Sequence, residues 1–345
     1  MSKVIRQSEG FFEDAPGFDW DIAIDCGDMT ASQFPPTDAD GHVIALQFEA
    51  LRKHAREQIY HVQGNHDANY YDEGEGTWFR KWIDPLGENP QYSGVLNENR
   101  PFPVQGRWDR YTFQAGNILF IMLSDRNDMP SPVGRGNSED QNKGGFPAGA
   151  VTRDTFEWWK QTVLDNQDKI IVTAHHHVLR DTTTASGYNE GGDYHGSSGG
   201  IEGSSYLYWT IENPDPEHFE YTVSEPGHPG PFEQFLADFH EEYGKPAIDF
   251  WVGGHTHVHG PEDTTGEKRI EEQKWGVTFL QVAAVTQYHA GSHPMSRVLT
   301  FTPGTSKAEI KLYLHEPTYE NHPVGWYVPY THTIPLRHTF TAPAE

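Results

Sequence analysis

Cysteine and basic side chains are scarce in this sequence. Cys26 is the only cysteine among 345 residues, which excludes an intrachain disulfide, so the fold does not depend on an oxidising compartment. Lysine and arginine together number 25 against 50 aspartate and glutamate residues, which gives a net charge of −25. Because like charges repel, this balance argues against general affinity for nucleic acid or for an anionic membrane.

Long apolar runs are also lacking. No stretch approaches the length of a membrane span, and the first residues contain no apolar segment of the kind found in a signal peptide. We therefore expect no membrane segment, and a cytoplasmic location is the default expectation. Hydrophobic residues still make up 35% of the chain, which is enough for a sizeable core at this length.

The sequence does contain polar residues grouped at the end of a short apolar run. The five residues 59–63 are expected to form a short buried strand, and Gly64-Asn65-His66-Asp67 follows directly. Glycine allows the chain to leave the strand in an unusual conformation, while the Asn offers a neutral oxygen and the His a nitrogen. Taken alone, this tetrapeptide is as compatible with a solvated turn as with a binding site.

Three other expected strands end in a similar way. They are expected at residues 20–24, 169–173 and 248–252, and they are followed by Asp25-Cys26-Gly27-Asp28, Ala174-His175-His176-His177 and Gly253-Gly254-His255-Thr256-His257. Open α/β sheets bind their ligands at the carboxyl ends of the strands. Four such ends in order therefore favour a binding site over an accident of composition.

The ordered motifs GD, GNHD, HH and GHTH resemble those of the calcineurin-like metallophosphoesterases, over about residues 21–257. The resemblance implies an α/β fold in the form of a four-layer αββα sandwich, with two mixed β-sheets flanked by helices. We expect this domain at residues 1–315 and an extended tail packed on it at residues 316–345. The implied activity is metal-dependent hydrolysis of phosphate monoesters or diesters by a metal-bridging hydroxide.

The resemblance also implies roles for single residues. Asp28 would bridge two divalent transition metals, drawn from Mn, Fe, Zn, Ni and Co. Asn65, His175 and His255 would complete the shell of the second metal, and His257 would belong to the first. Three consecutive histidines cannot all face one ion, because neighbours in an extended chain point to opposite sides. The resemblance to the family's strand-His-His pattern implies His175 as the ligand, with His176 next.

The catalytic and substrate-binding residues follow from the same resemblance. His66 would protonate the leaving group or steady the phosphorus centre, and Asp67 would orient it. The expected substrate is a small phosphate ester, and nucleotides, phospholipid head groups, sugar phosphates and cyclic nucleotides all remain open. Side chains expected near the substrate are Arg126, Asn127, His176 and His195.

One family motif is not found, since no Asp-x-His precedes Asp28. We expect that this motif lies on a strand before Met1 and that the 345-residue chain holds about one metal. An alternative is that Glu9 supplies the replacement ligand. A further alternative is a catalytically impaired family member that binds metal and a phosphate ligand without turnover.

Apolar periodicity predicts the remaining elements. Helices are expected at residues 2–13, 38–57, 152–166 and 231–243, the last with Gly244 as its C-cap. A hairpin is expected from residues 111–114 and 118–123, and further strands at 206–211, 219–223, 277–282, 297–302 and 308–315. Residues 180–205 are expected to form a lid over the site or, equally well, a surface loop.

Overall fold

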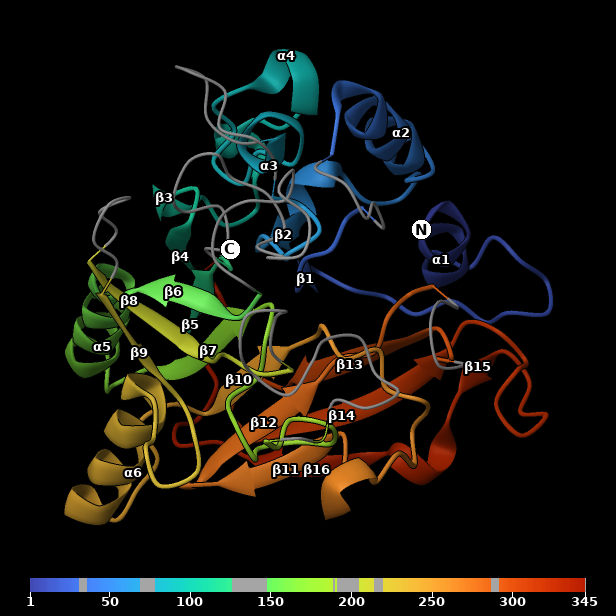
Figure 1. Ribbon diagram of the computed structural model, residues 1–345. Coiled ribbons are helices and arrows are strands. Elements are labelled where there is room, and N and C mark those ends of the chain that lie inside the picture. The colour runs from blue at the N-terminus through green and yellow to red at the C-terminus, as the bar shows by residue number, and fades with distance from the viewer. Residues whose placement is uncertain are drawn as a thin grey trace.

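The computed structural model describes residues 1–30, 36–68, 78–125, 148–188, 190, 205–213, 220–286 and 292–344. Its helices in chain order are α1 (Ser2–Ser8), α2 (Asp38–Phe48), α3 (Trp78–Trp82), α4 (Pro90–Ser93), α5 (Arg153–Asp165) and α6 (Pro231–Tyr243). Within these residues, no helix combines the length and the apolar character that crossing a membrane requires. Figure 1 shows these helices around several sheets.

A seven-stranded mixed sheet forms the centre of the fold, in the order β11-β12-β10-β7-β5-β4-β3. Its strands are β3 (Gln105–Arg107), β4 (Arg110–Ala115), β5 (Ile118–Leu123), β7 (Ile170–His175), β10 (Phe250–Gly253), β11 (Glu271–Lys274) and β12 (Val277–Gln281). The four central strands β5, β7, β10 and β12 run parallel, and β4 and β11 pair antiparallel at either side. The predicted hairpin of β4 and β5 is confirmed.

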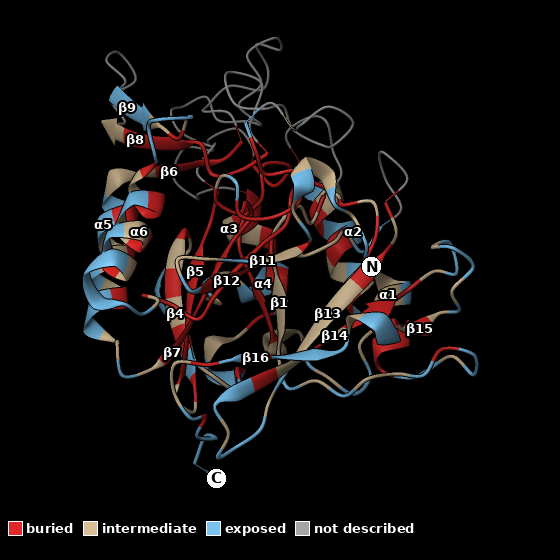
Figure 2. Cartoon of the chain, turned by 90° about the horizontal axis from the view of Figure 1, so that it is seen from below, coloured by how far each residue is buried: buried red, intermediate tan, exposed pale blue. Residues whose placement is uncertain are grey.

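The central strands are buried on both faces. Every residue of β5 and of β7 is buried, as expected for parallel strands covered on two sides. Alternate residues of β5 enter different apolar clusters, with Phe120 in one and Ile121 in the other. The sheet is therefore the middle of a layered structure, and buried residues run through its interior in Figure 2.

Helices α5 and α6 cover one face of this sheet. Trp159 of α5 and Leu236 of α6 are fully buried against the sheet side chain Trp251 and its neighbours. The bounds of α6 are those predicted, and Gly244 ends it in the left-handed conformation, with φ 64°, that favours glycine. The apolar spacing of α6 was sufficient for this prediction because its buried face is continuous.

A second group of strands covers the other face. β13 (Met295–Phe301), β14 (Lys307–Leu314), β15 (Gly325–Trp326) and β16 (His332–Pro335) form a four-stranded antiparallel sheet, and β1 (Ala23–Asp25) pairs parallel with β2 (Ile59–His61). Ile310 of β14 and Tyr60 of β2 lie in the same apolar cluster as Phe120. Ile59 faces the opposite way, into a cluster with α2 and α3. The layers follow the order of an α/β sandwich, as the resemblance implied.

A small separate sheet lies beside these layers. It consists of β6 (Ala150–Thr152), β8 (Trp209–Asn213) and β9 (Glu220–Val223), in the order β6-β8-β9. β6 and β8 are parallel and β8 and β9 antiparallel. The strand pattern at residues 206–211 and 219–223 indicated two of its strands.

Two predicted helices end earlier than expected. The first ends at Ser8, two residues before Gly10, whose φ is 75°. The second ends at Phe48, because the carboxylate of Glu9 accepts hydrogen bonds from the backbone N–H groups of Arg52 and its two successors at 2.9 Å each. These hydrogen bonds join residues 43 to 45 positions apart in the sequence. They give the backbone N–H groups the acceptors that a longer helix would have provided.

The C-terminal region contributes strands and a buried ion pair. β16 pairs with β14, so residues beyond 315 extend the second sheet. Arg337 donates to the carboxylate of Asp249 from its backbone N at 2.7 Å and from Nε at 2.9 Å. That carboxylate also accepts the N–H of Ile171 on β7 at 2.9 Å. The tail is thereby fixed to the start of the central strands.

Candidate metal centre

The fold brings the ends of four strands together. Asp28 follows β1, Asn65 follows β2, His176 follows β7 and His255 follows β10. β1 is parallel to β2, and β7 is parallel to β10, so the segments that leave each pair start on the same side. Polar residues that are far apart in sequence therefore meet in one place.

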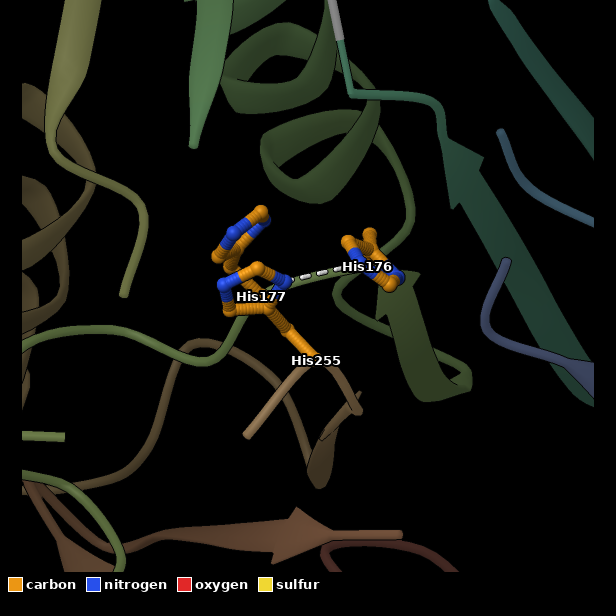
Figure 3. A group of neighbouring side chains, drawn as sticks. All are labelled: His176, His177 and His255. Carbon is orange, nitrogen blue, oxygen red and sulfur yellow. Dashed lines mark hydrogen bonds between the residues drawn. The ribbon is translucent and has the colours of Figure 1, made fainter. Parts of the chain in front are cut away.

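Four side-chain atoms from these segments form a compact group. Nε2 of His176 lies 3.1 Å from Oδ1 of Asn65, 3.1 Å from Nδ1 of His255 and 3.2 Å from Oδ2 of Asp28. Nδ1 of His255 lies 3.1 Å from the same Asn65 oxygen. The two rings and their contact are drawn in Figure 3. Spacings of this size suit four ligands around one ion, because ligand bonds of about 2.0–2.2 Å place neighbouring donor atoms at such separations.

The backbone at these positions is held in an uncommon conformation. φ is 61° at Asp28, 72° at His255 and 34° at His257, in the left-handed region that non-glycine residues rarely adopt. Such residues cost on the order of 1–3 kcal/mol each and cluster at functional sites. At Asp28 and His255 this conformation turns the side chains that follow β1 and β10 into the group.

Close packing of two glycines fixes the position of Asp28. A Cβ atom added to Gly27 would lie 2.5 Å from the backbone N of Gly64. One added to Gly64 would lie 2.3 Å from Oδ1 and 2.4 Å from the backbone N of Asp28. Only glycine permits this approach of the two loops, so the GD and GNHD motifs are coupled by contact.

The structure gives Asp67 other partners than the expected His66. Its carboxylate accepts hydrogen bonds from the backbone N–H of Asp28 at 2.9 Å, of Gly64 at 3.0 Å and of Thr30 at 3.2 Å. Burial, with the nearby Asp28 charge, raises the pKa of Asp67 to about 8. Asp67 thus joins the loop of the GD motif to the loop of the GNHD motif.

His66 is positioned through its backbone. Its N–H donates to Oδ1 of Asp28 at 2.9 Å, and its carbonyl accepts from Oγ1 of Thr30 at 2.8 Å. The residue is buried, with 3% of its surface exposed. These two bonds orient the loop through Asp28 and Thr30. No motif in the sequence indicated that Thr30 would contribute to the site.

The three consecutive histidines are placed differently from the expectation. His176, which was expected to contact substrate, lies in the group with Asp28, while His175, the expected ligand, does not enter it. Nδ1 of His176 lies 2.6 Å from the carbonyl of Cys26, which orients the ring. Burial alone lowers the pKa of His176, but the charge and hydrogen bond of Asp28 raise it to about 9.

His175 belongs to a second buried group, with Asp125 and His177. Asp125 follows β5 and was not among the expected site residues. A signal was present in the sequence, because Ser124-Asp125 leaves a buried strand in the same way as the other motifs do. His177 is also close enough to His176 and His255 to form a third possible combination of ligands.

The remaining predicted site residues are placed as follows. His257 is half-buried, two residues after His255, and belongs to none of these three combinations of described side chains. Arg126, Asn127 and His195 lie outside the described residues, as does most of the expected lid. Their roles therefore stay predictions.

The hydrogen bonds of the Glu9 side chain go to residues outside the metal-ligating groups. Oε1 lies 2.9 Å from Nδ1 of His54, and the same carboxylate receives three backbone N–H groups. His54 in turn stacks on Trp20 with ring centroids 3.6 Å apart. The alternative that Glu9 replaces an Asp-x-His ligand is not supported, because its oxygens are used in closing the turn after α2.

The donor set of the four-atom group fits a divalent transition metal. It offers one carboxylate oxygen, one amide oxygen and two imidazole nitrogens, all on side chains that are buried or nearly so. Imidazole favours Zn, Cu, Fe and Ni, whereas a site for Ca or Mg would be built from oxygen alone. The group of acidic and imidazole side chains is therefore chemically suited to hold an ion.

Comparison with protein families agrees with the sequence motifs. A model of the calcineurin-like phosphoesterases matches residues 6–259, which are 254 of the 345 residues. The match contains all four strand ends described above. Comparison with curated proteins gives no match.

Proposed function

Because the chain belongs to the calcineurin-like phosphoesterase family, we propose that it hydrolyses phosphate monoesters or diesters with a metal ion held by Asp28, Asn65, His176 and His255. The observation that supports this proposal is the set of 3.1–3.2 Å spacings among their four ligand atoms. His176 takes the place that we expected for His175. Because the protein has a net charge of −25, which repels an anionic ester, a cation is needed to offset the negative charge where the ester binds.

When bound, a divalent transition metal polarises the phosphoryl group and lowers the pKa of water so that hydroxide is available at neutral pH. The protein contributes the geometry. Asp28 is fixed through Asp67 and the two glycine loops, and the His176 ring through the carbonyl of Cys26. His257 follows on the same turn as His255, and we assign it to a second ion that Asp28 would share.

His66 is the residue proposed to act on the leaving group. The bond from its N–H to Asp28 ties its backbone to a metal ligand, so the ring position is coupled to the site. An imidazole suits proton transfer near neutral pH, because its ordinary pKa is about 6.5. In this proposal the His66 ring donates a proton to the departing oxygen. Asp67 affects the ring only by positioning the loop that carries it.

The test is an assay with p-nitrophenyl phosphate and bis-p-nitrophenyl phosphate in the presence of manganese chloride, together with measurement of bound metal. His176→Ala should lower both metal content and turnover, the latter by at least about 100-fold. His332→Ala is the matched control, because His332 also pairs with a carboxylate, Glu271 at 2.8 Å, but on the surface.

Three outcomes of the assay are distinct. Turnover that falls with the bound metal in His176→Ala and stays in His332→Ala supports the proposal. Metal bound by the wild type without turnover of either ester would favour the alternative of an impaired family member. Full metal content and full turnover in His176→Ala would overturn the ligand assignment.

A further inference from the structure

A second cluster of ionisable side chains is buried in the molecule, apart from the four proposed metal ligands. Asp125, His175 and His177 are each 0% exposed, and one ligand atom from each lies within 4.8 Å of the others. They come from adjacent parallel strands, since Leu123 of β5 lies opposite His175 of β7. Enclosing three ionisable side chains in this way is unfavourable unless their polar atoms are satisfied.

The carboxylate of this group is already oriented. Asp125 accepts hydrogen bonds from the backbone N–H of Ala150 at 2.8 Å and of Gly149 at 3.2 Å. Oδ2 of Asp125 also lies 3.9 Å from Nδ1 of His177. A carboxylate can accept about four hydrogen bonds, so capacity remains on the side that faces the histidines.

One ring nitrogen of His175 has no hydrogen-bond partner among the described residues. The other, Nδ1, has two contacts with the backbone of His177: it accepts the N–H at 2.8 Å, and in the other tautomer it can donate to the carbonyl oxygen at 3.1 Å. Nε2 of His175 is buried and has no hydrogen-bond partner within the part of the chain that the structure describes. Binding of a metal through Nε2 requires the tautomer in which Nδ1–H donates to the His177 carbonyl, which is the usual arrangement for a metal-binding histidine.

We propose that Asp125, His175 and His177 bind a divalent transition metal, such as zinc, separate from the ion held by Asp28, Asn65, His176 and His255. Two imidazoles and one carboxylate form a common ligand set for this class of ion. The ion satisfies the buried Nε2 of His175 and uses the carboxylate that the backbone of Gly149 and Ala150 has positioned.

This ion would hold the histidine segment in place. His175 and His177 flank His176 in the chain. Fixing their two rings would restrict the backbone from which the ring of His176 reaches Asp28. The carbonyl of His177 also accepts a hydrogen bond from Nε1 of Trp251 at 3.0 Å, which ties the segment to β10.

The experiment separates the two sites with the variant His176→Ala/His255→Ala, which removes both imidazoles of the proposed catalytic site. Zinc chloride is added to the metal-free protein, and bound zinc is measured after gel filtration. The variant should keep one zinc where the wild type holds at least one more. Adding His175→Gln should remove it, whereas adding His332→Gln, at a surface position, should not.

Spectroscopy of the double variant gives an independent reading. X-ray absorption at the zinc edge should show two imidazoles and a carboxylate or water oxygen around the ion. A folded double variant that binds no zinc, or whose zinc has no imidazole neighbours, would overturn the proposal. Because neither measurement uses phosphoesterase activity, its outcome is independent of whether the proposed function is correct.

Discussion

The carboxylate of Asp67 accepts a hydrogen bond from the backbone N–H of Asp28 at 2.9 Å, and this bond joins the GD and GNHD motifs across 39 residues. The same side chain also accepts the N–H groups of Gly64 and Thr30. The backbone of Asp28 has φ 61°, and these bonds help to hold it there. Asp67 thus determines where a proposed metal ligand stands.

Replacing Asp67 by Asn should weaken metal binding about 10- to 100-fold, as for other groups that orient a ligand. The Asn side chain would direct an NH₂ group toward backbone donors. Zinc titration of the purified variant measures the effect. Asp84→Asn is the control, because Asp84 is also buried and accepts the N–H of Glu88 and Asn89 at 2.8 Å each, in another part of the fold. Equal zinc affinity in the two variants would contradict the role proposed for Asp67.

Gly64→Ala should displace Asp28 and abolish tight metal binding at the site of Asp28, Asn65, His176 and His255, while leaving the protein folded. The added Cβ would lie 2.3 Å from the Asp28 carboxylate and cannot be accommodated without a shift of the loop. Circular dichroism and zinc content measure the two parts of the prediction. Gly230→Ala is a suitable comparison, since its Cβ would lie 3.2 Å from Ser224 at a distant helix end. A zinc content in Gly64→Ala equal to that of the wild type would show that the loops can separate freely.

Stability should fall on acidification through His315. Burial, with repulsion from Lys3 and the N-terminal ammonium, lowers the pKa of His315 to about 3. The unfolded residue titrates near 6.5, so below about pH 6.5 the unfolded chain binds a proton that the folded chain does not. This residue should therefore reduce the free energy of unfolding by about 1.4 kcal/mol for each further pH unit down to its folded pKa.

Urea unfolding of the wild type and of His315→Gln, at a series of pH values between 7.5 and about 4.5, measures that contribution. The variant should lose stability less steeply than the wild type, while His332→Gln should follow the wild type. Parallel curves for the wild type and His315→Gln would mean that His315 takes up its proton in the folded state.

Arg337→Ala should lower the free energy of unfolding by about 3–5 kcal/mol, because it leaves the buried carboxylate of Asp249 without its cation. Changing both residues, as in Asp249→Leu/Arg337→Met, should cost less than the single change. Lys3→Ala provides the surface comparison, since the Lys3–Glu316 pair has side chains 53% and 31% exposed and should contribute at most about 1 kcal/mol. A loss for Arg337→Ala no larger than for Lys3→Ala would contradict the argument.

The elements with continuous apolar periodicity were predictable from the sequence, α6 and the β4–β5 hairpin above all. The positions of the strand ends were also predictable, and the structure places Asn65 and His255 in contact there. The choice among three adjacent histidines was not, because a shift of one residue at a strand end turns each side chain to the other face. Only the three-dimensional register places His176 beside Asp28.

Contacts between distant segments account for the other differences. The early end of α2 depends on the carboxylate of Glu9, and no pattern within residues 38–57 reports it. β16 exists because it pairs with β14, while its own sequence, His332–Pro335, has little strand character. Asp125 was not assigned to a site because its partners, at Gly149 and His177, are remote in sequence.

The link between Asp249 and Arg337 also bears on how the protein is made. Arg337 is synthesised 88 residues after Asp249, an interval of roughly 4–18 s at about 5–20 residues per second on the ribosome. During that time β7 and β10 can associate only around a carboxylate that has no cation. A nascent chain at this stage carries an incomplete sheet and is prone to aggregate, so its yield in a cell should depend on chaperones that act before Arg337 has left the ribosome.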